Sequence, residues 1–333
     1  MTSSPPRNWR LNGLLVVLLF LWGCQPGAGS DPEGPQQKLT LAVSPATYSV
    51  LIAIADTKGY FTAAGLDASI KLYPSGRQAL EAVARGEAQV ATVADIAFAA
   101  QAIETPSLRV LASIATTNGS RIVARRDRDI RNPADLRGKK VGFTADTVSD
   151  YFLYAFLLTE NIAPEDVLRV NVPANRQTEI VVNGEVDAVS AFEIFAFEAT
   201  QRLGENAVVW ESQNNLDYHW LLATTAEVTR SPEPLKRLVK ALITAEDFVR
   251  ADGEEARRIL VRQWDFKPDF LQDSWTRTRV SVSFGQSIVT SLQNYFRWEK
   301  RKQGHSETPV DVMDFLYTGI LDEVAPRKVT VFK

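Results

Sequence analysis

The feature that most constrains the fold is a strand–helix–strand unit that occurs twice, about 100 residues apart. Residues 44–49 align with 144–149 at an offset of 100, and residues 85–93 align with 183–191 at an offset of 98. A drift of two residues over this span favours one architectural unit used twice. Independent convergence on a common α/β arrangement is the alternative. Under either interpretation, the chain forms two similar lobes.

Strands and helices alternate within the first unit. Residues 39–43, 68–74 and 90–94 have the short apolar pattern of buried strands, and helical patterns lie between them. Ser75 is followed three residues later by Gln78, which indicates a capping box at a helix start. This alternation predicts βαβ units and therefore a mainly parallel sheet in each lobe.

Two apolar segments are expected to connect the lobes. Residues 121–124 predict a strand that crosses into the second lobe, and residues 219–225 predict a strand that returns. The expected division is residues 38–120 plus 221–333 in one lobe and residues 121–220 in the other. Beyond it, an apolar stripe over 235–249 predicts a helix, and residues 254–300 read as further helices.

The N-terminus has the pattern of an export signal. Arg7 and Arg10 precede an unbroken apolar run over 14–22, which Gly23 and Cys24 follow. A bilayer-spanning helix needs ~20 apolar residues, and this run is much shorter. The pattern therefore indicates a signal peptide over residues 1–23.

The segment 21–24 resembles a bacterial lipobox, although Trp22 is bulkier than the residue usual there. The resemblance implies that Cys24 becomes the first mature residue and carries lipid, such as palmitate, that anchors the protein in a membrane. A plain secretory signal, with Cys24 incidental, is the alternative. Residues 24–37 are rich in Pro, Gly and Gln, which predicts a flexible tether.

Composition excludes several function classes. The 37 basic and 40 acidic side chains leave no broad basic field for nucleic acid. One Cys and two His cannot form a Cys-based or His-rich metal site. The nucleophile-elbow, zinc-protease, P-loop and dinucleotide motifs do not occur. We therefore expect no catalytic residues, no cofactor and no metal.

The order of several short motifs over residues 38–333 resembles the substrate-binding proteins of ABC importers for nitrate, sulfonate, taurine and thiamine precursors. Those motifs are Lys58–Phe61, Gly65–Asp67, Ser75–Gly76, Arg85–Glu87, Asp135–Val141 and Gly184–Ala188. The resemblance implies an α/β, two-lobe periplasmic-binding-protein-like fold of type II. Each lobe would be a mainly parallel sheet flanked by helices, with a ligand cleft between the lobes and a hinge of two crossing strands.

The resemblance also implies a function. The protein would be the extracytoplasmic solute-binding component of an ABC importer, a monomer that closes on a small polar organic ligand and presents it to a permease. One alternative is a sensory lipoprotein that serves a membrane receptor. Another is an enzyme on this fold, such as one that makes the thiamine pyrimidine. That enzyme group carries a Cys-rich segment, which is missing here.

The repeat selects candidate ligand residues in pairs, because ligands of open parallel sheets lie beyond the carboxyl ends of the strands. We expect Thr47 and Tyr48 in one lobe, and Thr144 and Thr147 in the other, to contact the ligand. Helix capping is the alternative role for the hydroxyls at these junctions, namely Ser44, Thr47, Ser49, Thr144, Thr147 and Ser149.

Two acids are equivalent at an offset of 98, because Asp95 and Glu193 each follow a third strand. Both are predicted to accept hydrogen bonds from a ligand amine or heterocycle N–H, and capping or ion pairing is the alternative. The related class often has Pro after the second acid, where this chain has Ile194. Together with Asp146 and Asp150, these acids favour an amine-bearing or heterocyclic ligand over a nitrate or sulfonate.

The remaining candidates lie at other strand ends. Ser75, Gly76 and Arg77 open a helix that could cradle an oxyanion, although Arg77 is equally suited to a solvated surface. Thr116 ends the strand before the hinge and is a predicted contact. Aromatic side chains near these ends could sandwich a planar ligand or pack in the core: Tyr48, Tyr151, Phe192 and Trp220.

Overall fold

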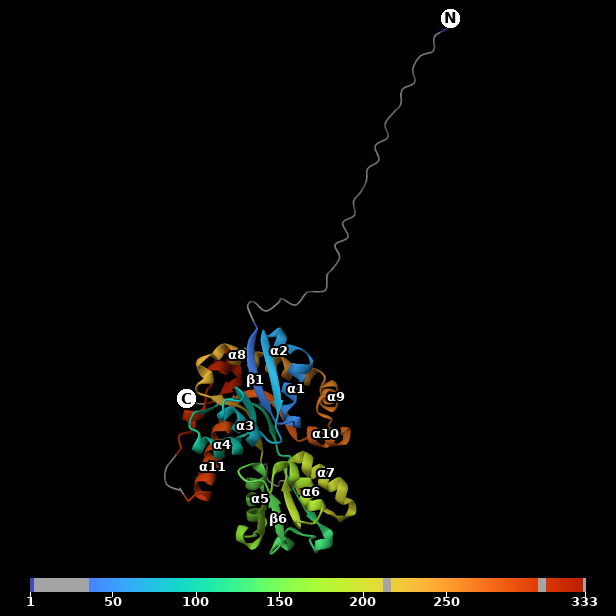
Figure 1. Cartoon of the computed structure of the whole chain (residues 1–333), viewed down its shortest axis with the longest axis vertical. Coiled ribbons are helices and arrows are strands. Elements are labelled where there is room, and N and C mark those ends of the chain that lie inside the picture. Colours follow the sequence, from blue (N-terminus) through green and yellow to red (C-terminus); the bar gives the residue numbers. More distant parts are fainter. Residues whose placement is uncertain (3–35, 212–216, 305–309, 332–333) are drawn as a thin grey trace. The chain divides into compact units, whose positions relative to one another are not determined.

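The structure is a computed structural model that describes residues 1–2, 36–211, 217–304 and 310–331. All but the first two residues of the predicted signal peptide, Cys24 and nearly all of the predicted tether lie outside the described residues. From Pro32 onward the chain forms one compact unit, which Figure 1 shows as two sheets flanked by helices. Within the described ranges, no helix has the length and apolar character that crossing a bilayer requires.

The larger part, which we call lobe 1, is built on a seven-stranded sheet with the order β12-β11-β4-β10-β3-β1-β2. The strands are β1 (Gln37–Val43), β2 (Leu66–Leu72), β3 (Val90–Ala94), β4 (Leu108–Thr117), β10 (Tyr218–Thr225), β11 (Thr278–Gly285) and β12 (Val329–Thr330). Its helices are α1 (Val50–Thr57), α2 (Tyr60–Ala63), α3 (Gly76–Ala84), α4 (Asp95–Glu104), α8 (Pro232–Ala251), α9 (Gly253–Trp264), α10 (Pro268–Trp275), α11 (Gln286–Lys302) and α12 (Gly319–Val324).

Lobe 2 is built on a five-stranded sheet with the order β7-β6-β8-β5-β9. Its strands are β5 (Arg121–Arg125), β6 (Lys140–Phe143), β7 (Leu168–Asn171), β8 (Ala188–Ala191) and β9 (Ala207–Glu211). Its helices are α5 (Val148–Thr159), α6 (Gln177–Val182) and α7 (Glu193–Leu203). Apolar side chains pack on both sides of this sheet, with α5 in one cluster and α6 and α7 in the other.

The strand register confirms that the two lobes are equivalent. β1 pairs in parallel with β3 so that Leu41 faces Val90, and β6 pairs in parallel with β8 so that Val141 faces Ala188. These two pairs are related by the offsets of 100 and 98 that the sequence shows. In both lobes the next strand, β10 or β5, runs antiparallel to the third strand of the unit.

Both sheets are mixed rather than mainly parallel. In lobe 1, β10 pairs antiparallel with β3 and β4, and β11 pairs antiparallel with β4. The physical reason for β5 and β10 is that each arrives from the other lobe and runs against the direction of the βαβ strands. Strand β11 follows α10 within lobe 1 and runs in the same direction as β10. Strand β11 also corrects the expectation of helices alone over 254–300, since Val280, Val282 and Phe284 alternate with polar residues as in a strand.

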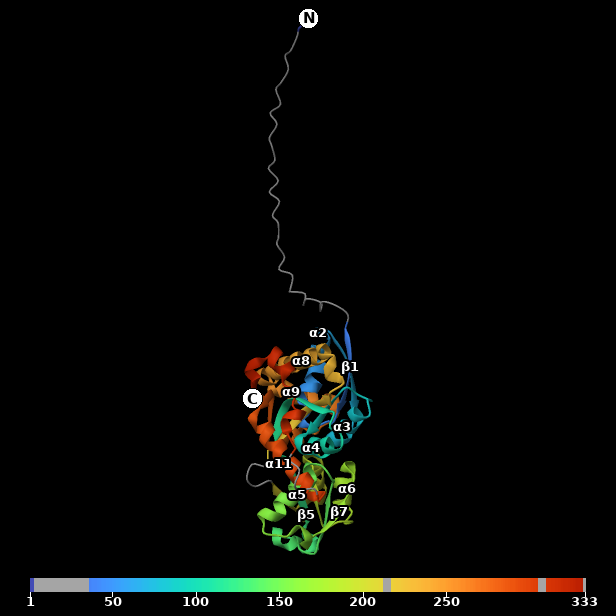
Figure 2. The same ribbon diagram turned by 90° about the vertical axis from the view of Figure 1, so that its left-hand side faces the viewer.

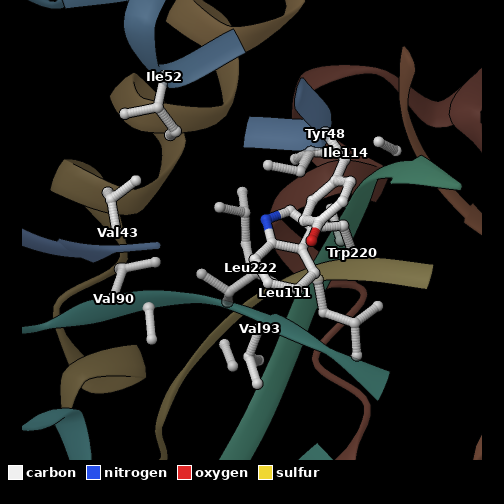
Figure 3. Close-up of a cluster of buried hydrophobic side chains, with 14 of the residues drawn as sticks. Val43, Tyr48, Ile52, Val90, Val93, Leu111, Ile114, Trp220 and Leu222 are labelled. Atoms are coloured by element: carbon white, nitrogen blue, oxygen red, sulfur yellow. The ribbon is translucent and has the colours of Figure 1, made fainter. Parts of the chain in front are cut away.

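The core of lobe 1 lies between its sheet and the helices around it. Figure 3 shows part of this core, where Val43, Val90 and Leu222 pack near Ile52 of α1. The first six residues of α1, 50–55, are all buried. A helix that is apolar all round belongs in the interior, so α1 holds the strand ends beside it in a rigid frame.

Candidate ligand-binding site

A cavity of about 30 Å³, which we call the inner cavity, lies between residues of the two lobes. Every wall residue except Trp220 ends a parallel strand or lies within five residues after one, and Trp220 lies near the start of the antiparallel strand β10. Lobe 1 supplies Ser44, Tyr48, Ser75, Gly76, Arg77, Ala94, Ala97 and Trp220, and lobe 2 supplies Thr147, Val148 and Phe192. The cavity therefore lies where parallel sheets place their ligands, beyond the carboxyl ends of the strands.

Aromatic side chains form one wall of the inner cavity (Figure 3). The rings of Tyr48 and Trp220 lie 4.4 Å apart between centroids, and the rings of Tyr48 and Tyr218 lie 6.0 Å apart. The Trp220 indole N–H donates a hydrogen bond to the Ser49 hydroxyl at 2.7 Å, which fixes the indole plane. Burial, with a smaller effect from nearby Glu193, raises the pKa of the Tyr48 hydroxyl, so it stays neutral at physiological pH.

The start of helix α3 approaches this wall very closely. A Cβ atom at Gly76 would lie 2.8 Å from the Trp220 ring and 2.9 Å from the Val93 Cα, so glycine is required for this approach. The Ser75 hydroxyl accepts a hydrogen bond from the Gln78 N–H at 3.3 Å, which confirms the predicted helix cap. Ser75 therefore caps the helix and lines the cavity at once.

The hydroxyl residues predicted as contacts divide into two groups. Tyr48 and Thr147 line the inner cavity, whereas Thr47 and Thr144 do not. Thr47 is fully buried, and its hydroxyl accepts a hydrogen bond from Ser274 at 2.6 Å. The Thr144 hydroxyl donates to the carbonyl of residue 172 and accepts from residue 177, both at 2.9 Å. Both side chains are thus occupied within the framework.

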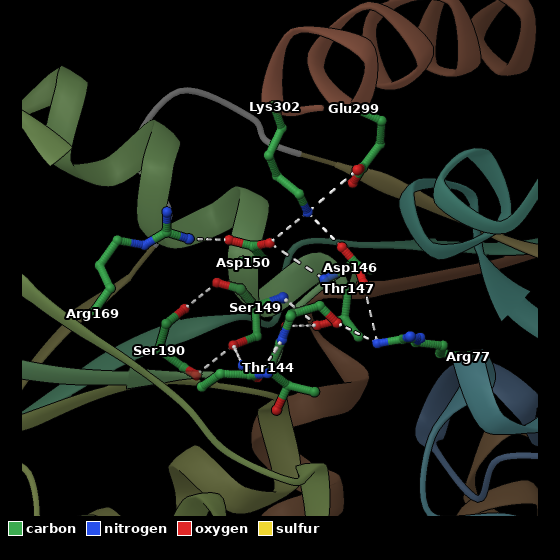
Figure 4. Close-up of polar contacts among 12 residues, drawn as sticks. Arg77, Thr144, Asp146, Thr147, Ser149, Asp150, Arg169, Ser190, Glu299 and Lys302 are labelled. Atoms are coloured by element: carbon green, nitrogen blue, oxygen red, sulfur yellow. Dashed lines mark hydrogen bonds and ion pairs between the residues drawn. The ribbon is translucent and has the colours of Figure 1, made fainter. Parts of the chain in front are cut away.

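The equivalent serines Ser49 and Ser149 also hold the framework. The Ser49 hydroxyl donates to the Ser44 carbonyl at 2.9 Å, and the Ser149 hydroxyl donates to the Ser190 carbonyl at 2.7 Å. Figure 4 shows Ser149 among these polar contacts of lobe 2. Thr116 lies on β4 opposite His219 and away from the cavity lining, contrary to the expectation of contact.

Asp95 does not line the inner cavity either. Its side chain is fully buried, and it accepts hydrogen bonds from the N–H groups of Ile96 at 2.9 Å and His219 at 3.0 Å. The Ser291 hydroxyl donates a third, at 2.5 Å. Burial nevertheless raises the pKa of Asp95 to about 7. The carboxyl therefore connects α4, β10 and α11. Its hydrogen bond from the Ile96 N–H lies at the start of α4, in keeping with the capping role that the sequence leaves open for Asp95.

Glu193, the equivalent acid of lobe 2, is also not a lining residue, although it directly follows Phe192, which is one, and its environment differs from that of Asp95. The side chain is 2% exposed, and neither carboxyl oxygen makes a hydrogen bond of normal geometry with a described residue. The carboxyl packs against the backbone of the first crossing, because a Cβ atom at Gly119 would lie 2.4 Å from its Oε1. Burial raises the pKa of Glu193 to about 7. An unsatisfied buried carboxyl is costly, so a donor beside it would be strongly stabilised.

Ion pairs join the two lobes near Arg77, which lines the inner cavity (Figure 4). Lys302 Nζ of α11 lies 2.5 Å from Asp146 Oδ1 and 3.0 Å from Asp150 Oδ2. Arg77 Nη1 lies 3.3 Å from Asp146 Oδ2, and Arg169 pairs with Asp150 within lobe 2. Both views of the fold show α11 reaching from lobe 1 to α5 (Figures 1 and 2), where Tyr151 and Trp298 pack edge to face. Tyr151, one of the aromatic residues that could stack on a planar ligand, packs between α5 and α11 instead.

These contacts weaken the inference that the four acidic side chains favour an amine-bearing or heterocyclic ligand. Asp95, Asp146 and Asp150 are all engaged by groups of the protein itself, so three of the four acids no longer favour an amine. Of the four, Glu193 alone makes no hydrogen bond of normal geometry with a described residue, and the nearby Ser274 hydroxyl and Arg121 only partly offset the effect of burial on its pKa. Elsewhere in the described parts of the chain, no group of three or more His, Cys, Asp or Glu side chains is placed to hold a metal ion.

Comparison with known proteins assigns the family. The family model described as NMT1/THI5-like matches residues 46–256, which is more than half of the chain. The chain belongs to the NMT1/THI5-like family. It is 23% identical to the formylaminopyrimidine-binding protein of Halalkalibacterium halodurans over 269 residues, which is 78% of this chain and 80% of that protein.

Solved structures confirm the periplasmic-binding-protein fold. The MOPS-bound alkanesulfonate-binding protein SsuA of Xanthomonas axonopodis pv. citri superposes with a TM-score of 0.74 at 14% identity, over 86% of this chain and all of that one. The desulfurization enzyme DSZB superposes with a TM-score of 0.65 at 16% identity, over 88% of this chain and 99% of that one. Binding proteins and at least one enzyme therefore share this architecture, and function must be argued from the site.

Proposed function

We propose that this NMT1/THI5-like protein is the extracytoplasmic solute-binding component of an ABC importer. The observation that carries the proposal is the inner cavity, whose walls come from the strand ends of both lobes. A ligand held by both lobes favours the closed state, which a permease can recognise. Turning a 1:99 equilibrium into 99:1 needs ~5.5 kcal/mol of preference for that state, which contacts in one lobe alone cannot supply.

The proposed ligand is a small planar heterocycle with N–H or amine donors. Trp220, Tyr48 and Phe192 offer flat apolar surfaces for a ring. The Glu193 carboxyl, buried behind the lining next to Phe192, would offer an acceptor once the lobes separate. A sulfonate would need cationic partners, but the one cation of the lining, Arg77, already pairs with Glu81 and Asp146. The relative whose name specifies a formylaminopyrimidine supports the same ligand class.

Ligand entry requires the cavity to enlarge. At about 30 Å³ it has room for little more than one water, whereas pockets for drug-sized ligands span roughly 300–1,000 Å³. Separation of the lobes about the crossing strands β5 and β10 would open it. The sequence predicts lobes of residues 38–120 with 221–333 and of residues 121–220. We propose to move the second boundary to just before Tyr218, because β10 lies wholly in the sheet of lobe 1.

Export and lipid anchoring complete the proposal. Residues 1–23 would be removed as a signal peptide, and Cys24 would carry the lipid that keeps the protein at the membrane beside its permease. The test is a Cys24→Ser variant, which should move from the membrane fraction to the soluble fraction. Continued membrane association of this variant would contradict the anchor.

A non-enzymatic role fits the chemistry of the described residues. They include no cysteine, since the single Cys of the chain is Cys24. The Nδ1 of His219 contacts the Ser113 hydroxyl at 3.2 Å within the sheet of lobe 1, and neither residue lines the inner cavity. No oriented nucleophile and base therefore face the proposed ligand.

Titration calorimetry on the full chain tests the binding role. We expect 4-amino-5-hydroxymethyl-2-methylpyrimidine to bind and methanesulfonate not to bind. Glu193→Gln should weaken the pyrimidine by about tenfold or more, the loss of one charge-assisted hydrogen bond. Glu185→Gln, at a half-exposed surface acid of the same lobe, is the matched control and should have no effect. Binding of the sulfonate alone would overturn the ligand class, and binding of neither would overturn the binding role at this cavity.

A further inference from the structure

A second cavity, of about 160 Å³, adjoins the inner cavity, and we call it the outer chamber. Residues of α3, α4, α11 and the loop before α5 form its walls: Arg77, Glu81, Ala97, Ala100, Gln101, Glu104, Thr105, Asp146, Glu299 and Gln303. Arg77 and Ala97 line both cavities. The Arg77 side chain therefore stands on the boundary between an aromatic space and a polar one.

The outer chamber carries an excess of negative charge. Four carboxyl groups line it, from Glu81, Glu104, Asp146 and Glu299. Arg77 pairs with the first and third of these, and Lys302, next to the chamber, lies 3.3 Å from Glu299 Oε2. Two cations thus face four acids, so the chamber attracts a cation and repels an anion.

Two acceptors in these walls make no hydrogen bond of normal geometry with a described residue, although one of them, Glu299, has Lys302 Nζ 3.3 Å from its Oε2. Glu299 is fully buried, and neither of its carboxyl oxygens has a hydrogen bond of normal geometry with a described residue. The side-chain carbonyl oxygen of Gln101, on α4 opposite, is likewise buried without a partner. Both groups are acceptors, so what would satisfy this wall is a donor. Figure 4 shows the Glu299 carboxyl linked to Lys302, Lys302 linked to Asp146, and Asp146 linked to Arg77.

We propose that the outer chamber is a subsite for a positively charged nitrogen of the ligand, with the planar ring in the inner cavity. This inference rests on the proposed function and deepens it, since it gives the ligand a ring and a separate ammonium or similar cation. The ammonium group supplies a donor to Gln101 and adds a second cationic partner to Glu299, beside Lys302. It also competes with the Arg77 guanidinium for Glu81 and Asp146, so Arg77 limits cation binding.

A matched set of three probes tests the subsite by titration calorimetry on the full chain. 2-Phenylethylamine, 2-phenylethanol and 3-phenylpropionate share a ring and a short chain and differ in charge. We expect the amine to bind most tightly and the carboxylate least. Glu299→Gln and, separately, the exposed Glu104→Gln should weaken the amine by about tenfold relative to the alcohol. Arg77→Gln should strengthen the amine.

The control variant is Glu254→Gln, because that acid lies on α9 and its side chain is 72% exposed, and it should change no affinity. Equal affinity of the amine and the alcohol would overturn the subsite. So would equal losses for both probes in Glu299→Gln and Glu104→Gln. If the aminopyrimidine still binds, the proposed function survives that failure. If n-butylamine binds in a Glu299-dependent way but no ring compound does, the subsite stands and the proposed inner-cavity function fails. Binding of none of these probes overturns both.

Discussion

The two lobes place equivalent acids in opposite circumstances. Asp95 and Glu193 are each the first residue of the helix that follows a third strand, at the predicted offset of 98. Asp95 accepts three hydrogen bonds, whereas Glu193 accepts none of normal geometry from the described residues. The repeated unit therefore sets where the backbone goes but does not set what the side chain meets.

The difference comes from elements outside the repeat. The partners of Asp95 include Ser291 of α11 and His219 of β10, and α11 packs closely on α4. Helix α11 belongs to the C-terminal segment, which is built around lobe 1 and has no counterpart in lobe 2. Glu193 instead faces the crossing backbone at Gly119. One copy of the acid is thus held by the framework, while the other lacks such hydrogen bonds, which is consistent with the ligand contact proposed for it.

The largest expected effect comes from replacing each of these two acids by alanine in turn. Asp95→Ala leaves the Ser291 hydroxyl and two buried N–H groups without an acceptor, so we expect a loss of ~2–4 kcal/mol in the free energy of unfolding. Glu193→Ala should leave this free energy unchanged or higher, because it removes an unsatisfied buried carboxyl. Urea unfolding of both variants makes the comparison. Equal destabilisation would show that Glu193 is as structural as Asp95.

Gly76 and its equivalent position in lobe 2 give a second contrast. Gly76→Ala forces a methyl group against Trp220 and Val93 and should cost ~1–3 kcal/mol through overpacking. Between the segments at offsets 100 and 98, Pro74 aligns with Pro173 at an offset of 99, so the position equivalent to Gly76 is Asn175, which is exposed. Asn175→Ala should therefore change the melting temperature very little. A similar shift in both variants would mean that the approach of α3 to Trp220 is not a special constraint of lobe 1.

The buried acids predict how stability depends on pH. Asp95, Glu193 and Glu299 each have a pKa of about 7 in the folded protein, above their ordinary values near 4. The folded state thus holds protons that the unfolded state has lost, and this stabilisation disappears as pH rises through about 7. Between pH 6.5 and 8 we expect a loss of roughly 0.5–1 kcal/mol per group, read as a falling melting temperature.

His219 acts in the opposite direction. Burial lowers its pKa to about 4, so it adds roughly 0.4 kcal/mol of stability between pH 6.5 and 8, about half of what one of the acids loses. Asp95→Asn should flatten the slope by about one third. A melting temperature that rises from pH 6.5 to 8 would contradict the assignment of these three acids.

The smallest expected effect concerns the seam between the lobes. Lys302→Gln breaks the ion pairs to Asp146 and Asp150, and because Lys302 and Asp146 are about one-third exposed we expect no more than ~1 kcal/mol. The closed state should lose this amount, so ligand affinity should fall by a few-fold, and less at high salt. Arg176→Gln, at a surface pair within lobe 2, should leave affinity unchanged. Equal affinity in Lys302→Gln would mean that the seam does not help closure.

The sequence alone determined the two-lobe α/β fold, the repeat offsets and the strand ends where a ligand would lie. It could do so because hydrophobic period, helix caps and glycine positions are local signals, and they place Ser75, Tyr48 and Thr147 at those ends with no knowledge of the rest of the chain. One further local signal lies inside the region expected to be helical: the alternating apolar and polar residues of β11, which indicate a strand.

Only the tertiary structure decided which members of each equivalent pair reach the cavity. The Thr47 hydroxyl is bonded by Ser274, 227 positions away, and Asp95 is bonded by Ser291, 196 positions away. Such partners come from segments that follow the repeat in the chain and fold back onto lobe 1, and no local pattern records them. A buried polar group must find a partner wherever the packed chain supplies one, so its role is settled by the whole fold and not by its own sequence neighbourhood.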